Sequence, residues 1–242
     1  MGILIISDIH SNLTALEAVL ADAGQVDAVW CLGDLVGYGP DPNECITRVC
    51  ELPNLVCIIG NHDAAALNQI DSGTFNPEAR DAIRWTQNTL SDGSLAFLKS
   101  LPERLEMEDV TLVHGSPRHP VWEYLLDTKN ATQSFAHFET SYCFVGHTHL
   151  PSIYLLGKDN HSARLMIPEA SSHMALTPRA ILNPGSVGQP RDRDARAAYA
   201  IYSPEEHVWE YRRVSYQVKE VQGRMEAAGL PDRHIQRLAA GW

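Results

Sequence analysis

The sequence lacks the features that would mark a thiolate metal site, a secreted protein or a membrane protein. Its five cysteines include no C-x-x-C pair, so we expect buried free thiols and no cysteine-rich zinc site. No apolar run approaches the length of a membrane-spanning helix, and the first residues show neither the basic nor the long apolar segment of a signal peptide. We therefore expect a cytoplasmic protein with no membrane partner.

Basic residues are also scarce. Lysine and arginine total 19 against 30 aspartate and glutamate residues, the formal net charge is −11, and no run of basic residues occurs. So acidic a surface repels the phosphate backbone, and long nucleic acid is not an expected partner. A small phosphorylated substrate is compatible with this charge, because bound metal ions would offset several carboxylates. The sequence does not indicate the oligomeric state.

What the chain does contain is a series of buried-strand patterns, each ending in polar side chains. Residues 3–6 are four consecutive apolar residues, which is typical of a strand buried on both faces of an α/β sheet. Asp8 and His10 follow directly. We expect extended backbone here, so that both side chains project to the same side. Since ligands bind just beyond the carboxyl ends of strands in open α/β sheets, the pattern predicts a site at this edge.

Four further apolar stretches end in residue types that bind metals: 28–32 before Asp34, 55–59 before Asn61, His62 and Asp63, 110–113 before His114, and 142–145 before His147 and His149. Helical patterns separate the first three strands, which makes them parallel neighbours. One of these helices is expected to begin at a capping box formed by Asp41 and Glu44. We therefore expect the polar residues to meet at one edge.

The rest of the chain predicts one domain, 1–242, with two further regions. Residues 64 to about 99 read as helical, and residues 105–113 suggest a hairpin or paired strands. The range 64–112 is too long for a simple crossover, which predicts a helical insertion, or cap, over the strand ends. After residue 149 the pattern alternates, and we expect a second, partly antiparallel sheet from these stretches: 153–156, 164–167, 180–182, 198–202 and 207–212. A helical tail is expected from Val214 to Gly241.

The strand-end residues form a set of nitrogen and oxygen donors without thiolates: Asp8, His10, Asp34, Asn61, His114, His147 and His149. A single histidine after a strand is more often an ordinary loop residue, and it is the joint arrangement that indicates a metal site. The set suits two borderline divalent ions, such as manganese, iron, zinc, cobalt or nickel, rather than a calcium site. A pair of such ions can clamp the attacking and leaving oxygens of a phosphoryl displacement.

In order and spacing, these motifs resemble those of the calcineurin-like metallophosphoesterase superfamily: Asp8-x-His10, Gly33-Asp34, Gly60-Asn61-His62-Asp63, His114-Gly115 and Gly146-His147-x-His149. Residues 183–188, N-P-G-S-V-G, are similar to the bacterial and archaeal phosphodiesterase branch. The resemblance implies an α/β (α+β) fold, a four-layer α-β-β-α sandwich of two mixed sheets flanked by helices. It also implies hydrolysis of a phosphoester bond in a small phosphorylated substrate, by a phosphodiesterase or a phosphomonoesterase.

The resemblance implies a role for each motif residue. The ligands would divide between two metal ions: Asp8, His10 and His149 for the first, Asn61, His114 and His147 for the second, with Asp34 bridging both. A hydroxide bridging the metals would attack phosphorus in line. His62 would be the general acid that protonates the leaving oxygen, Asp63 would orient its ring, and Asn61 would also contact a phosphate oxygen.

One motif departs from the phosphoprotein phosphatases of the superfamily. Those enzymes carry Asp-Arg shortly after Gly-Asp, whereas residues 35–38 here are L-V-G-Y, so another cation must bind the phosphate. Arg191 and Arg118 are the candidates, and Tyr38 is a candidate wall of the pocket. Arg191 lies in an alternating charge run, so a solvated loop is an equal alternative for it.

Two other functions stay open from the sequence. A nuclease would share the chemistry but needs a basic groove, which the net charge of −11 disfavours. A non-catalytic interaction scaffold on the same fold could lose ligands, especially at His62, but the set here is complete. Histidines outside the motifs are interpreted as surface or satisfied polar residues: His119, His137, His161, His173, His207 and His234.

Overall fold

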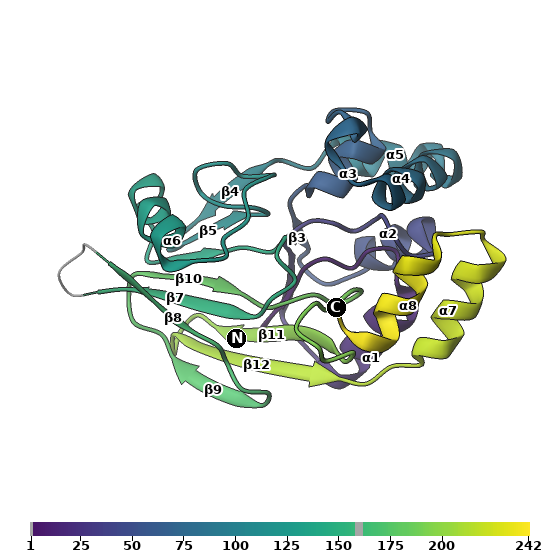
Figure 1. The fold of residues 1–242 in the computed structure, drawn as a ribbon. Helices are drawn as coiled ribbons and strands as arrows, with labels where there is room; N and C mark the ends of the chain where they lie inside the picture. Colours follow the sequence, from purple (N-terminus) through teal and green to yellow (C-terminus); the bar gives the residue numbers. More distant parts are fainter. Residues whose placement is uncertain (1, 158–161) are drawn as a thin grey trace.

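The computed structural model describes residues 2–157 and 162–242, which form two six-stranded mixed sheets (Figure 1). The first sheet has the spatial order β3 (Val56–Cys57), β2 (Ala28–Cys31), β1 (Ile3–Ile6), β11 (Ala197–Ser203), β12 (Val208–Val214) and β9 (Ser172–Ala175). The second has the order β4 (Arg104–Met107), β5 (Val110–Val113), β6 (Tyr142–Phe144), β10 (Ala180–Asn183), β7 (Ser152–Leu156) and β8 (Ala163–Met166). His161 lies outside the described residues.

Helices cover the outer faces and one end of the sandwich (Figure 1). The first sheet is covered by α1 (Leu13–Ala23) and α2 (Pro42–Cys50), and the second by α6 (Thr128–Ser134). The remaining helices lie toward one end: α3 (Asn61–Ala66), α4 (Pro77–Thr89), α5 (Asp92–Lys99), α7 (Val218–Ala227) and α8 (Asp232–Ala240). The predicted α-β-β-α sandwich is confirmed.

Strand β1 shows why its sequence is apolar throughout. Ile3 and Ile5 pack between the two sheets, whereas Leu4 and Ile6 pack on the other face against helix residues such as Leu16. Both faces of the strand are therefore buried, as the continuous apolar run predicts. Because β1 and β2 are parallel, and β5 and β6 are parallel in the second sheet, the carboxyl ends of each pair lie together.

The predicted membership of the second sheet is wrong for its last two strands. β11 pairs antiparallel with β1, with Ala200 opposite Ile5, and β12 continues the first sheet beyond it. Alternation along a strand reports which face is buried, but it does not identify the neighbouring strand. Strand β9 was not predicted from the sequence. Two of its four residues are exposed and the other two are half-buried, so no apolar run marks it.

The range 64–112 is helical only as far as Lys99. Residues 104–107 and 110–113 form the antiparallel hairpin β4–β5, which belongs to the second sheet and is not part of a helical cap. The predicted hairpin is therefore confirmed, and only the range given to the helical cap, 64–112, was too long.

The predicted capping box at Asp41 is also wrong. The Asp41 carboxylate accepts hydrogen bonds from the Arg224 guanidinium at 3.0 and 2.9 Å and makes no cap to its own helix. It thereby ties α7 to the start of α2. Among residues 2–157 and 162–242, every helix falls short of the length or apolarity needed to span a bilayer.

Candidate metal centre

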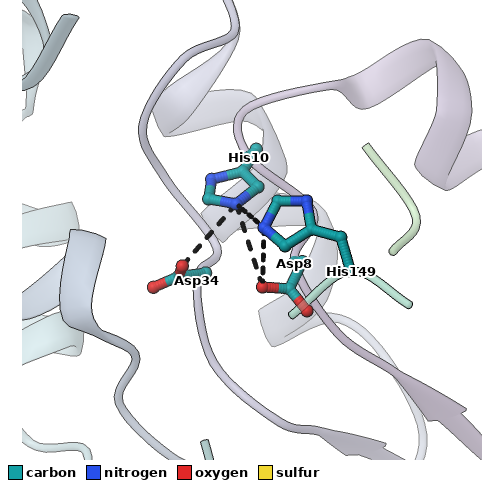
Figure 2. Close-up of side chains that lie close together, drawn as sticks. All are labelled: Asp8, His10, Asp34 and His149. Atoms are coloured by element: carbon teal, nitrogen blue, oxygen red, sulfur yellow. Dashed lines mark hydrogen bonds and ion pairs between the residues drawn. The ribbon is translucent and has the colours of Figure 1, made fainter. Parts of the chain in front are cut away.

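The predicted ligands meet where strands of both sheets end. Asp8, His10, Asp34 and His149 point toward one another (Figure 2), and their donor atoms lie within 4.8 Å of one another. A second group, formed by Asp34, His114 and His147, meets the same limit. Asp34 belongs to both groups, which is the arrangement that a bridging carboxylate requires.

The backbone that presents these side chains is not extended, contrary to the prediction for Asp8 and His10. Five of the residues adopt positive φ angles: Asp8 at 54°, His10 at 47°, Asp34 at 54°, His147 at 65° and His149 at 60°. Each such non-glycine residue costs on the order of 1–2 kcal/mol. Strain of this kind gathers at functional sites, where the surrounding structure holds it in place.

Hydrogen bonds to backbone carbonyls fix the tautomers of four histidines. In each ring one nitrogen, here called the outer nitrogen, lies near a backbone carbonyl oxygen, and the other is called the inner nitrogen. The distances are 3.0 Å from His10 Nδ1 to Val36, 2.8 Å from His114 Nδ1 to Leu32, 2.6 Å from His149 Nδ1 to Gln189, and 3.2 Å from His147 Nε2 to Trp122. A carbonyl oxygen only accepts hydrogen bonds, so these nitrogens carry the protons. In a neutral ring the inner nitrogen then keeps its lone pair.

The inner nitrogens face one another in pairs. His10 Nε2 lies 3.1 Å from His149 Nε2, and His114 Nε2 lies 3.2 Å from His147 Nδ1. Among the described residues, Asp8 Oδ1 and Asp34 Oδ2 are buried without a hydrogen-bond partner. Lone pairs and carboxylate oxygens that converge in this way fit a pair of cations, and outer hydrogen bonds to carbonyls are the usual support of metal-binding imidazoles.

Charges within the centre support the same assignment. Although burial acts in the opposite direction, His114 and His62 hold the pKa of Asp34 well below its usual value. Against the effect of burial, Asp34 raises the pKa of His114 to about 9. Burial raises the pKa of Asp8 to about 7. Protons held at Asp8 and His114 are those that a bound metal ion displaces.

Asp34 and Asn61 are held by the turn at the start of α3. Asp34 Oδ1 accepts a hydrogen bond from the His62 backbone N–H at 2.8 Å, while its Oδ2 lies 3.3 Å from His114 Nε2. Asn61 Oδ1 lies 3.1 Å from the same nitrogen. A Cβ atom on Gly60 would stand 2.1 Å from Asp34 Oδ1, so this position requires glycine.

His62 lies beside the centre, but the predicted contact of its ring with Asp63 is not present. Asp63 instead accepts hydrogen bonds from the backbone N–H groups of Val36 and Gly60, both at 3.0 Å, and so braces two ligand-bearing loops. The Nδ1 atom of His62 has no hydrogen-bond partner within the described part of the chain. Its ring packs against Tyr38 at 4.3 Å, and burial lowers its pKa.

A cavity of about 360 Å³ opens beside Asn61 and His62. Of the three predicted substrate-binding residues, Arg191 and Tyr38 line it. Arg118 is not among its lining residues and is paired with Glu123 in the loop before α6. The structure therefore separates Arg118 from the other two.

Seven residues that line the cavity were not predicted from the sequence, and four of them are aromatic or basic: Phe75, Trp122, Tyr124 and Arg237. The aromatic residues lie in loops whose sequence carries no periodic signal. Arg237 lies on α8, where a basic residue is typical of any solvated helix face. His234 on the same helix is buried beside the Tyr38 ring, so of its two interpretations, surface or satisfied polar residue, the first is wrong.

Comparison with known proteins places this geometry in a family. Residues 1–207 match the model of the calcineurin-like phosphoesterase superfamily domain. The chain belongs to this superfamily. It is accordingly a hydrolase that acts on phosphoester bonds, and its Asp and His groups are positioned to bind metals.

Relatives cover the chain to different extents. A metallophosphoesterase from Sphaerobacter thermophilus has a crystal structure that is 47% identical, with all of both chains covered and a TM-score of 0.91. The protein MJ0912 of Methanocaldococcus jannaschii is 36% identical over 247 residues, which cover 99% of this chain and 98% of that protein. A symmetrical bis(5'-nucleosyl)-tetraphosphatase of Pectobacterium carotovorum is 30% identical over 101 residues, 35% of this chain and 36% of that enzyme.

Proposed function

We propose that this superfamily member is a two-metal phosphoesterase that cleaves a small phosphorylated substrate, as a phosphodiesterase or a phosphomonoesterase. The observation that carries the proposal is the presence of two groups of metal donors that share Asp34. Asp8, His10 and His149 would hold one ion, His114, His147 and Asn61 the other. Two bound ions supply Lewis acidity that activates water and neutralises charge on the phosphoryl group.

The surrounding residues have complementary roles in this proposal. Asn61 also borders the cavity, and its side chain would contact a phosphate oxygen as well as a metal. His62 would donate a proton to the leaving oxygen. Burial keeps its ring neutral in the free protein, and a bound phosphate anion would raise its pKa. Arg191 would bind the phosphate, since its guanidinium faces the same cavity.

A nucleotide is the substrate class that we favour. Phe75, Trp122 and Tyr124 supply aromatic rings to the cavity, and such rings stack on bases. The partial similarity to the tetraphosphatase of Pectobacterium carotovorum supports the same class. A nuclease of the same chemistry is less well supported, because the net charge of −11 opposes binding of a long backbone.

The test is metal content and turnover of wild type and Asp34→Asn. We expect wild type to bind two divalent ions and to hydrolyse a 4-nitrophenyl phosphomonoester or phosphodiester in a metal-dependent way. Asp34→Asn should lose affinity for at least one ion by more than about a hundredfold, since even residues behind the ligands contribute 10–100-fold. If reconstituted wild type shows no metal-stimulated turnover of either ester, the proposal is wrong, and a non-catalytic scaffold is favoured.

A further inference from the structure

Helices α7 and α8 lie beyond residues 1–207, the part of the chain that matches the superfamily model. They nevertheless pack against the site. Tyr38 shares one buried cluster with Val221, Met225 and Leu238, and the His234 ring lies 4.5 Å from the Tyr38 ring. Figure 1 shows both helices at the end of the sandwich beside α1 and α2. The two helices are therefore part of the wall around the candidate centre.

Through α8 the cavity gains a second guanidinium group. Arg191 and Arg237 both line the cavity that contains Asn61 and His62. Arg191 Nη2 donates weakly to Tyr38 at 3.4 Å and to Gln189 Oε1 at 3.1 Å. Among the described residues, neither arginine forms an ion pair, and the buried Nε atom of each has no hydrogen-bond partner.

Most arginines elsewhere in the molecule have carboxylate partners. Arg118 pairs with Glu123, Arg213 with Asp192 and Arg224 with Asp41. Burial and the nearby charge of Arg191 lower the pKa of Arg237, which shows that the two cations repel each other. Two like charges that line one cavity, with no carboxylate at ion-pair distance among the described residues, form a site for an anion.

Aromatic side chains line the same cavity. The Phe75 ring lies 5.1 Å from the Trp122 ring in an edge-to-face arrangement, and Tyr124 stacks on His147 at 3.8 Å. The side chains of Trp122 and Tyr124 remain 39% and 44% exposed, which leaves ring surface for a ligand. A volume of about 360 Å³ falls within the range of small-molecule sites, and a single phosphate group would leave most of it empty.

We propose that α8 completes a second phosphate subsite, in which Arg237 binds the phosphate group next to the one bound at the metal centre. Arg191 would lie between the two groups, and the aromatic rings would hold the base. The preferred substrate is then a nucleotide with at least two consecutive phosphates. This inference rests on the proposed function, and it makes Arg237 a specificity-determining residue.

The test compares the binding of two ligands that differ by one phosphate group. The dissociation constants of AMP and of α,β-methylene-ADP are measured by titration calorimetry on the metal-loaded protein, for wild type, Arg237→Ala and Arg237→Lys. A charge-assisted hydrogen bond of about 1.5 kcal/mol corresponds to roughly a tenfold change in affinity. We expect Arg237→Ala to weaken the diphosphate analogue about tenfold and AMP less than about twofold, with partial recovery in Arg237→Lys.

The matched control is Arg233→Ala on the same helix. Arg233 is exposed, pairs with Glu78 at 3.7 Å and is not among the residues that line the cavity. Its variant should bind both ligands as wild type does. Equal weakening of both ligands by Arg237→Ala, or weakening of neither, overturns the proposal. Because binding is measured directly, the discrimination can be present even if the protein hydrolyses neither nitrophenyl ester, so the two proposals fail separately.

Discussion

Four histidines of the candidate centre have tautomers that are fixed by hydrogen bonds to backbone carbonyl oxygens. His10, His114 and His149 donate from Nδ1 to backbone carbonyls, whereas His147 donates from Nε2. The site therefore depends on main-chain atoms of residues that are not themselves proposed ligands. Replacing the side chains of Val36, Leu32 or Gln189 would leave these carbonyls in place, which explains why no sequence pattern marks them.

At the same scale, His62 has a role that leaving-group chemistry can test. If its ring protonates the leaving oxygen, His62→Gln should slow hydrolysis of an ester with a poor leaving group, such as an alkyl phosphate, by roughly 10²–10⁴-fold. A 4-nitrophenyl ester, whose leaving group needs little protonation, should be slowed far less. The measurement is kcat for both esters at saturating metal. Equal loss on the two esters would assign His62 a structural or binding role instead.

At the scale of elements, the sequence predicted correctly those features that depend on a local pattern of apolar and polar residues. The run at residues 3–6 identified β1 because both of its faces are buried, and the strand ends identified the residues that the structure brings together. Pairing of β11 with β1 is a long-range choice that alternation does not encode. The contribution of Arg237 was hidden for a similar reason, since it depends on how α8 docks against Tyr38.

The docking of α8 makes stability depend on pH. His234 is 1% exposed, and burial lowers its pKa from 6.5 to about 4. Between these values the unfolded chain binds a proton that the folded chain excludes, so this contribution to stability is full above pH 6.5 and is lost as the pH falls toward 4. The expected loss is about 3 kcal/mol.

Urea unfolding between pH 7 and 4.5 measures this effect. His234→Phe keeps an aromatic ring beside Tyr38 and removes the titrating group, so its stability should fall less with acid than that of wild type. His137→Gln is the control, because His137 is exposed and its replacement leaves the docking of α8 untouched, so this variant should keep the wild-type profile. Parallel profiles for wild type and His234→Phe would contradict the expectation.

At the scale of the whole molecule, the candidate centre joins the two sheets. Asp8 and Asp34 follow β1 and β2 of the first sheet, whereas His114 and His147 follow β5 and β6 of the second. Bound ions would therefore connect the layers at one end of the sandwich. Without ions, His10 Nε2 faces His149 Nε2 at 3.1 Å, and Asp8 Oδ1 is buried without a hydrogen-bond partner among the described residues.

Metal removal should consequently lower the stability of the entire fold. At a free metal concentration of about 100 times Kd, one site stabilises the folded state by about 2.7 kcal/mol. For a chain of this size that corresponds to a fall in Tm of roughly 5–10 °C on chelation. Calorimetry with and without EDTA measures the shift, and hydrogen exchange should show loss of protection at the ends of both β1 and β5. Asp34→Asn should respond little to EDTA, because its sites are already weakened. An unchanged Tm in wild type would mean that the ions, if bound, do not connect the two sheets.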